Sequence, residues 1–211
     1  MFERQKNSVL KKVIRGKDPI KLFLDSFNHA RKNCVRSDPE AMALATSTRP
    51  DATPQVRYVL YKGIELGGLI FCSNNQSLKG KTLAKNPKAA VAFYWHEIGM
   101  QLRWSGEVKE IPASWSDAYW LQRPWQSRVS SSLSIQSHTL ESRLALENDY
   151  ALAIKNGEKK APPRPKNWGG FLIIPSSIEF WFAHPYRLHH RIEFSRKSVA
   201  SKMWKKRELY P

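Results

Sequence analysis

The chain has 211 residues, 41% hydrophobic and 11% aromatic, which is enough apolar material for one sizeable domain with its own core. It carries 35 Lys and Arg against 18 Asp and Glu, a formal charge of +17 at pH 7 that attracts anions. No apolar run reaches the roughly 18 residues of a membrane helix, and the first residues lack the apolar stretch of a signal peptide. We therefore expect a cytoplasmic protein with no membrane partner.

Much of the excess positive charge lies near the two ends of the chain. Residues 1–17 are basic and contain little turn chemistry, so we expect them to be mobile until something orders them, ahead of a single domain over 18–211. Charge at chain ends is typical of solvated tails, not of a surface that reads a nucleic acid. Nucleic acid is therefore not the partner we expect, although the charge keeps it as an alternative.

Cys34 and Cys72 are far apart and have no metal-ligand spacing, so no metal site is predicted. The sequence leaves a disulfide between them open, but we expect two free thiols, buried or half-buried. This cysteine usage indicates a reducing compartment.

The first half of the chain predicts one helix followed by strands. Asp18-Pro19 is typical of a helix start, and apolar residues follow at helical spacing, so we expect a helix over 19–33. Apolar or alternating runs predict strands at 41–47, 55–62, 69–73, 89–95 and 100–111, with a short helix over 78–85. The start of that short helix is rich in donors and is a natural seat for phosphate.

The second half predicts two helices and then more strands. Pro112 begins a helix that contains Tyr119, and residues 139–154 have the pattern of an amphipathic helix. We expect a loop in the Ser-rich segment 130–137 and an exposed, proline-rich connection over 159–166. Residues 171–180 predict a strand, a break and a second strand, and residues 199–204 are expected to close the sheet.

This order of elements decides the fold class. Consecutive antiparallel strands with few helices lack the alternation of a doubly wound fold. The chain also lacks a G-x-G-x-x-G motif and a P-loop. We predict a mainly β protein with covering helices (α+β), built on an antiparallel, closed or split β-barrel.

The stretch from Trp181 to Arg191 is the most suggestive candidate site. It places an indole, arginines and histidines within a few residues, directly after an alternating run. Fixed cations beside an aromatic ring at a strand end are suited to clamp a flat, anionic ligand.

Five motifs along residues 18–211 resemble the pyridoxine/pyridoxamine 5'-phosphate oxidase family. They are Asp38-Pro39-x-Ala41-Met42-x-Leu44-Ala45-Thr46, Arg57-Tyr58-Val59-Leu60-Tyr61-Lys62, Trp168-Gly169-Gly170-Phe171, Ile178-Glu179-Phe180-Trp181 and Arg187-Leu188-His189-x-Arg191. The resemblance implies an FMN-binding split β-barrel that works as a homodimer, with FMN at the subunit interface. It also implies hydride transfer from C4' of pyridoxamine or pyridoxine 5'-phosphate to the flavin, reoxidation by O₂, and release of pyridoxal 5'-phosphate and H₂O₂.

The resemblance also implies roles for individual residues. The expected FMN contacts are Arg57, Tyr58, Val59, Leu60, Tyr61, Lys62, Cys72, Ser73, Lys79, Gln101, Gln136, Ser137, Trp181 and Arg191. The expected substrate-phosphate contacts are Tyr119, Arg123 and Ser127, with Lys62 also touching the substrate. Arg187 and His189 are expected to flank the substrate ring on its reactive side as the catalytic pair. Without the resemblance, Tyr119, Arg123 and Ser127 would read as a polar helix end.

The chain departs from the family pattern at several places, among them His190, where an Asp is common, and two places at or next to the expected cofactor contacts. Cys72-Ser73 stands where an aromatic residue and Thr are usual, and Leu78 stands where an Arg is usual. Two alternatives stay open: a related FMN oxidase with another substrate, as in phenazine pathways, and a non-catalytic protein that binds a flavin or pyridoxal phosphate.

Overall fold

A computed structural model describes residues 2–49, 52–156 and 162–211, with side chains from residue 8 onward. The described residues form eight strands, each antiparallel to its neighbours. The strands are β1 (Ala41–Thr46), β2 (Gln55–Glu65), β3 (Gly68–Asn74), β4 (Lys88–Trp95), β5 (Met100–Glu110), β6 (Trp168–Phe182), β7 (His190–Ser195) and β8 (Lys205–Leu209). Their order is β3-β2-β1-β4-β5-β6-β7-β8, and a further pairing of β3 with β6 closes the first six into a barrel. The predicted fold class is confirmed.

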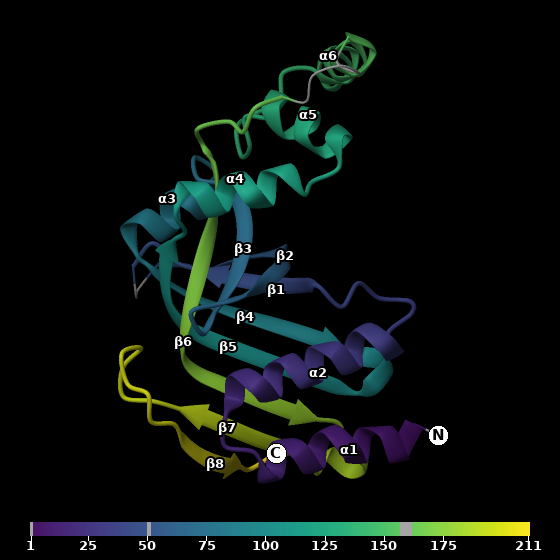
Figure 1. Cartoon of the computed structure of the whole chain (residues 1–211), viewed down its shortest axis with the longest axis vertical. Coiled ribbons are helices and arrows are strands. Elements are labelled where there is room, and N and C mark those ends of the chain that lie inside the picture. The colour runs from purple at the N-terminus through teal and green to yellow at the C-terminus, as the bar shows by residue number, and fades with distance from the viewer. Residues whose placement is uncertain (1, 50–51, 157–161) are drawn as a thin grey trace.

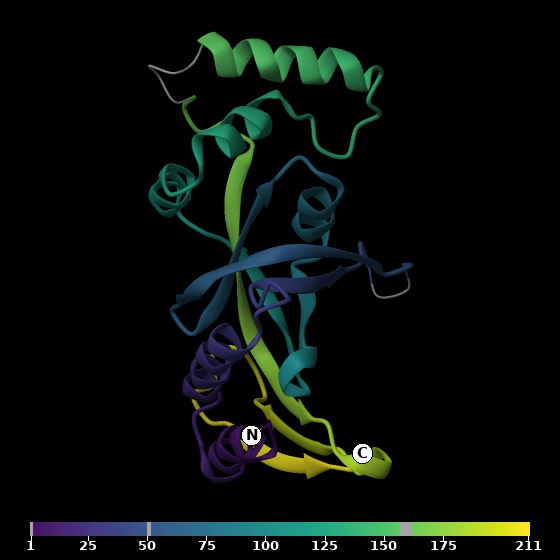
Figure 2. The same cartoon turned by 90° about the vertical axis from the view of Figure 1, so that its right-hand side faces the viewer.

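Strand β6 connects the two ends of the molecule. It runs from the region of α4 and α5 at one end to β7 and β8 at the other (Figures 1 and 2). The predicted break in this run is wrong, because the strand is continuous through Pro175. A register shift between Ser105 and Gly106 of β5 accommodates the proline, and a Cβ atom on Gly106 would lie 1.9 Å from the carbonyl oxygen of Ile174.

The helices cover the barrel from two sides. They are α1 (Phe2–Arg15), α2 (Pro19–Asn33), α3 (Leu78–Lys85), α4 (Ala113–Leu121), α5 (Trp125–Leu133) and α6 (Arg143–Asn156), with short 3₁₀ turns η1 (His96–Ile98) and η2 (Pro185–Arg187). Helix α2 has the predicted bounds, because the Asp18 carboxylate accepts from the backbone N–H groups of Ile20 and Lys21. Phe23 and Phe27 of α2 pack into the barrel core.

Three segments differ from the sequence prediction. Residues 125–133 form α5 where a loop was expected from residue 130, because Val129 is buried and serine hydroxyls bond to carbonyl groups of the preceding turn. The sheet is closed by β8 and not by residues 199–204. Residues 2–15 form α1, which packs against α2 and buries Val9 and Val13 in the core.

Helix α6 forms in the predicted region but begins at Arg143, four residues later than predicted, and it has no buried residue of the kind that an amphipathic helix would provide. It contacts α5. The predicted connection over 159–166 lies partly outside the described residues. Cys34 is buried and Cys72 half-buried, and both are free, as predicted. No helix within the described ranges is long and apolar enough to span a membrane.

Candidate functional site

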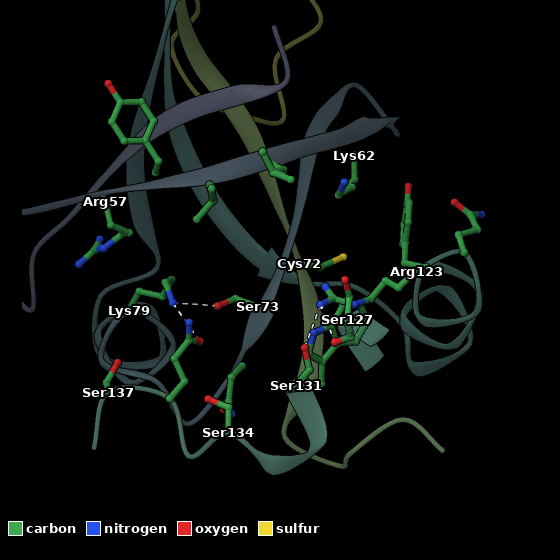
Figure 3. A pocket seen from close by; sticks show the side chains of 18 of the residues that line it. Arg57, Lys62, Cys72, Ser73, Lys79, Arg123, Ser127, Ser131, Ser134 and Ser137 are labelled. Carbon is green, nitrogen blue, oxygen red and sulfur yellow. Dashed lines mark hydrogen bonds between the residues drawn. The ribbon is translucent and has the colours of Figure 1, made fainter. Parts of the chain in front are cut away.

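A cavity of about 900 Å³ opens between β2, β3, the start of α3, and the α4–α5 junction (Figure 3). It gathers these predicted site residues: Arg57, Tyr58, Val59, Leu60, Lys62, Cys72, Ser73, Lys79, Tyr119, Arg123, Ser127, Gln136 and Ser137. Among the described residues that line it, none is an Asp or Glu. The cavity is therefore lined by cations, hydroxyls and apolar side chains, which favours a flat ligand with negative charge.

Arg57 occupies one end of this cavity. Its Nη1 donates to Oγ1 of Thr46 at 2.7 Å and to the carbonyl oxygen of Leu44 at 3.3 Å, and its Nη2 donates to Oε1 of Gln55 at 3.2 Å. These bonds fix the plane of the guanidinium group. Burial lowers the pKa of Arg57, yet an arginine stays charged.

Lys79 of α3 lies on the same side of the cavity as Arg57 (Figure 3). Its residue surface is 7% exposed, and Nζ donates to Oγ of Ser73 at 3.0 Å, Oγ of Ser77 at 3.2 Å and Oε1 of Gln136 at 3.2 Å. All three acceptors are neutral, and within the described chain no carboxylate pairs with this ammonium group. A buried cation with neutral partners is costly, so this end of the cavity fits an anionic group such as a phosphate.

Backbone groups also contribute to the end of the cavity that contains Arg57 and Lys79. The N–H of Leu78, at the start of α3, donates to Oγ of Ser137 at 3.2 Å. Ser137 has a φ of 72°, in the left-handed region, and the turn that this makes brings its hydroxyl to the helix start. Leu78 itself lines the cavity, whereas Lys81, on the same helix, is exposed and outside the cavity lining. Lys81 therefore does not replace the missing arginine.

The opposite side of the cavity carries the predicted phosphate cradle (Figure 3). Tyr119 belongs to α4, Arg123 to the junction, and Ser127 to the first turn of α5. These three residues are four positions apart in the sequence, but they do not belong to one helix, because the chain passes from α4 to α5 between them. Nη2 of Arg123 donates to the carbonyl oxygen of Ser127 at 3.2 Å and to Oγ of Ser131 at 2.8 Å.

The guanidinium group of Arg123 is also held by aromatic rings. It lies 5.7 Å from the ring centroid of Trp120 and 5.2 Å from that of Trp168. Its Nε is buried without a hydrogen-bond partner in the described structure. An oriented cation with an unused donor fits a second anionic group on this side.

Cys72 and Lys62 also line the cavity. Burial raises the pKa of the Cys72 thiol to about 11, although the charges of Lys62 and Arg123 lower it. The thiol therefore stays protonated near neutral pH and is no nucleophile there. Nζ of Lys62 lies 3.9 Å from Oε2 of Glu40.

Sequence reasoning missed several cavity residues. They include Asn74, Gln122, Pro124, Ser131, Ser134 and Trp168. Ser131 could have been found by continuing the spacing of four from Arg123 through Ser127, but the Ser-rich composition suggested a loop. Trp168 was noticed in a motif without a role.

The remaining predicted residues do not reach this cavity. Gln101, Trp181 and Arg191 form one row across β5, β6 and β7, since each is the direct cross-strand partner of the next. The ring of His189 lies 4.5 Å from that of Trp181, and its Nδ1 accepts from the backbone N–H of His184 at 3.1 Å. Arg187 is exposed beside this row.

Two further observations concern the predicted residues outside the cavity. Tyr61 points into the core, where it packs against Phe23 and Phe27, and burial raises its pKa to about 12. The turn that carries Arg187 is strained, because Tyr186 and Arg187 have φ values of 56° and 61°. Left-handed residues other than glycine concentrate at functional sites.

Arg191 is held by a buried carboxylate. Its Nε donates to Oε1 of Glu179 at 2.8 Å, and Arg103 donates to the other oxygen of Glu179. Burial alone raises the pKa of Glu179, but the hydrogen bonds and charges of Arg191 and Arg103 outweigh it, so the pKa is lowered overall. Nη1 of Arg191 also donates to the carbonyl oxygen of Tyr210, which ties the C-terminal residues to this row.

Comparison with known proteins identifies the family. A sequence profile described as "Pyridoxamine 5'-phosphate oxidase" matches residues 29–153, more than half of the chain. The chain belongs to this family. A second profile, "Pyridoxine 5'-phosphate oxidase C-terminal dimerisation region", matches residues 168–211, so the family's dimerisation region is present.

Individual relatives agree with this assignment. The pyridoxine/pyridoxamine 5'-phosphate oxidases of Bradyrhizobium diazoefficiens and Sinorhizobium fredii are each 43% identical over 194 residues, 92% of this chain and 90% and 93% of theirs. The crystal structure of PhzG from Burkholderia lata 383 in complex with tetrahydrophenazine-1-carboxylic acid matches with a TM-score of 0.87 and 32% identity over 95% of this chain and 96% of that one. A pyridoxamine 5'-phosphate oxidase-related, FMN-binding protein of Nostoc punctiforme, at 17% identity and a TM-score of 0.71, shares the fold.

Proposed function

We propose that this protein is an FMN-dependent oxidase that converts pyridoxamine or pyridoxine 5'-phosphate to pyridoxal 5'-phosphate. With pyridoxamine 5'-phosphate, O₂ and water are consumed, and ammonia and H₂O₂ are released. With pyridoxine 5'-phosphate, O₂ is consumed and H₂O₂ is released. The two free thiols fit a reducing compartment such as the cytoplasm.

One observation carries the proposal: a single cavity has two separate anion seats. Arg57 and Lys79 lie on one side, and Arg123 with its unused Nε lies on the other. FMN and a B6 phosphate are each a flat ring that carries one phosphate group. Two such ligands stacked in the cavity would each find a cationic seat at its own end.

We place the flavin phosphate at Arg57, Lys79 and Ser137, and the substrate phosphate at Tyr119, Arg123 and Ser127. The half-buried Cys72 and the buried Ser73 would then lie beneath the stacked rings. FMN, when bound, supplies the two-electron acceptor for the hydride that leaves C4' of the substrate. The cavity residues orient the substrate, and close, aligned contact is the main requirement of such a transfer.

We propose that the remaining residues are contributed by the second subunit of a homodimer, with FMN at the interface. Trp168 and Trp181 lie at opposite ends of β6, so one chain cannot bring the row around Trp181 to its own cavity. The dimerisation region covers this strand. In the dimer, Trp181 and Arg191 would contact the flavin, while Arg187 and His189 would flank the substrate ring.

The test is aerobic turnover with defined stoichiometry. Purified protein loaded with FMN should form one pyridoxal 5'-phosphate and one H₂O₂ for each pyridoxamine 5'-phosphate consumed. Pyridoxamine without its phosphate should react at least roughly 100-fold less efficiently, because the Arg123 seat stays empty. Loss of the phosphate preference would contradict the assignment of that seat.

A second candidate is the oxidation of a reduced phenazine carboxylate, favoured by the close structural match to PhzG. Such a ligand carries a carboxylate and no phosphate. Competition between pyridoxamine 5'-phosphate and a dihydrophenazine carboxylate decides between the two. Oxidation of the latter alone would replace the first proposal.

A further inference from the structure

Helix α5 turns hydroxyl groups toward the cavity. Ser127, Ser131 and Ser134 line the cavity, spaced so that they share one face of the helix. Ser127 was expected at the substrate phosphate, but Ser131 has no role so far. We propose that Ser131 is a further phosphate-binding and positioning residue. It holds Arg123 in place, and its hydroxyl group donates a hydrogen bond to a phosphomonoester.

The contact between Ser131 and Arg123 is the shorter of the two that Nη2 makes. The distance from Nη2 of Arg123 to Oγ of Ser131 is 2.8 Å, against 3.2 Å to the carbonyl oxygen of Ser127. Because both protons of Nη2 are used, the guanidinium plane is fixed between the rings of Trp120 and Trp168. Ser131 therefore helps to determine where the remaining donors of Arg123 point.

The proton of the Ser131 hydroxyl is available. Neighbouring serines use theirs within the helix: Oγ of Ser130 donates to the carbonyl oxygen of Ser127, and Oγ of Ser132 donates to that of Arg128. Within the described residues, the Ser131 hydroxyl accepts from Arg123 but has no acceptor for its own proton. A hydroxyl that accepts from a cation becomes a better donor, and this one lines a cavity whose described lining contains no carboxylate.

The chemistry of this pair points to a phosphomonoester dianion. One oxygen can accept from the Ser131 hydroxyl and another from Nε of Arg123, which is buried and unpaired in the described structure. A neutral ligand could accept these hydrogen bonds but would not bring the negative charge that pairs with the guanidinium group of Arg123. The identity of the ring attached to this phosphate rests on the proposed function, but phosphate recognition by Ser131 does not.

The test compares binding of pyridoxal 5'-phosphate with binding of pyridoxal, by calorimetric titration of the FMN-loaded protein. Ser131→Ala should weaken pyridoxal 5'-phosphate binding about tenfold or more, as expected for a hydrogen bond to a charged group, and leave pyridoxal binding unchanged. Ser131→Thr keeps the hydroxyl and should restore affinity. Ser130→Ala, on the same helix but with its hydroxyl already bonded, is the matched control and should bind both ligands like the wild type.

The outcomes separate this inference from the oxidase proposal. Unchanged pyridoxal 5'-phosphate binding in Ser131→Ala, or an equal loss of pyridoxal binding, would overturn the role of Ser131. If binding depends on Ser131 but pyridoxamine 5'-phosphate is not oxidised, the inference stands and the oxidase proposal fails. If the wild type binds both ligands equally, the phosphate seat itself is refuted.

Discussion

Arg57 and Lys79 bring two positive charges to one end of the cavity. Burial lowers the pKa of Lys79, and the nearby charge of Arg57 lowers it further. The hydroxyl and amide oxygens around the ammonium group do not neutralise it. This end of the site is therefore arranged to receive an anion, and its properties lead to the first two predictions.

Substitutions at the Arg57 and Lys79 end of the cavity should affect FMN binding, whereas a substitution of Arg187 should affect turnover. Arg57→Ala and Lys79→Met should weaken FMN binding by roughly 10- to 100-fold, because each removes a charged donor from the phosphate seat. Arg187→Ala should retain FMN and lose turnover instead. FMN retention is measured after gel filtration and turnover under saturating FMN, with the exposed Lys81→Met as control. Equal effects of Arg57→Ala and Arg187→Ala on both quantities would contradict the assigned roles.

The lowered pKa of Lys79 predicts a pH dependence of stability in the FMN-free protein. In the unfolded chain the pKa lies near its ordinary value of 10.5, above that in the folded protein. Between these two values the unfolded chain binds more protons, so the contribution of Lys79 to the free energy of unfolding rises with pH. Below the folded pKa, the full cost of burying the charge is present. Denaturant titrations should therefore show that the free energy of unfolding of the wild type rises relative to that of Lys79→Met as pH rises through this window. A difference that does not change with pH would refute the buried charge.

Glu179 should stabilise the fold more than an exposed ion pair does. Its side chain is 4% exposed and bonds to two arginines, of which Arg103 is half-exposed. We expect Glu179→Gln to cost about 2–3 kcal/mol, somewhat less than a fully buried pair. Glu147→Gln, in an exposed helical pair with Arg143, should cost about 0.5 kcal/mol or less.

The stabilisation of the fold by Glu179 should depend on pH. Because the folded pKa is lowered, the stabilisation is present above the unfolded pKa and is lost as pH falls through the folded pKa. Denaturant titrations of wild type and Glu179→Gln should therefore converge at acidic pH. A gap that persists at low pH would mean that the carboxylate charge is not responsible.

The outer face of β2 should form part of the subunit interface. Val56, Tyr58 and Leu60 are 65%, 76% and 43% exposed, and they lie opposite the small side chains of Ala45, Ala43 and Ala41 on β1. An apolar face of this kind is typical of a surface that another copy covers.

A charge placed on that face should break the dimer. Tyr58→Asp should raise the dimer dissociation constant roughly 100-fold or more, because each dimer would contain the substitution twice. Sedimentation velocity across a concentration series measures this. Leu66→Asp, at an equally exposed leucine in the β2–β3 turn, should leave the dimer intact. A monodisperse dimer of Tyr58→Asp at low concentration would exclude this face from the interface.

Local signals predicted much of the fold. The bounds of α2 follow from the Asp18 cap and Pro19, which act within a few residues. The misread segments depend on contacts across the chain: Pro175 is accommodated in β6 by the register shift on β5, and α5 is supported by burial of Val129. Composition alone could not anticipate either.

The sequence predicted many of the residues that line the cavity but not how they are arranged. Alternation predicts Arg57, Val59 and Tyr61 on one face of β2, and the structure agrees, since this is the less exposed face. Alternation does not show that Tyr61 packs in the core while Arg57 lines the cavity. A sequence also cannot say which copy of a chain supplies a residue. The separation of Trp181 from the cavity became visible only with the complete path of β6.

The most direct test of the central claim is an anaerobic absorbance spectrum of the FMN-loaded protein during addition of pyridoxamine 5'-phosphate. We predict loss of the oxidised-flavin absorbance with one equivalent of pyridoxal 5'-phosphate formed for each flavin, and return of the yellow colour when air is admitted. A protein that binds FMN but keeps its oxidised spectrum with both pyridoxamine and pyridoxine 5'-phosphate would contradict the account.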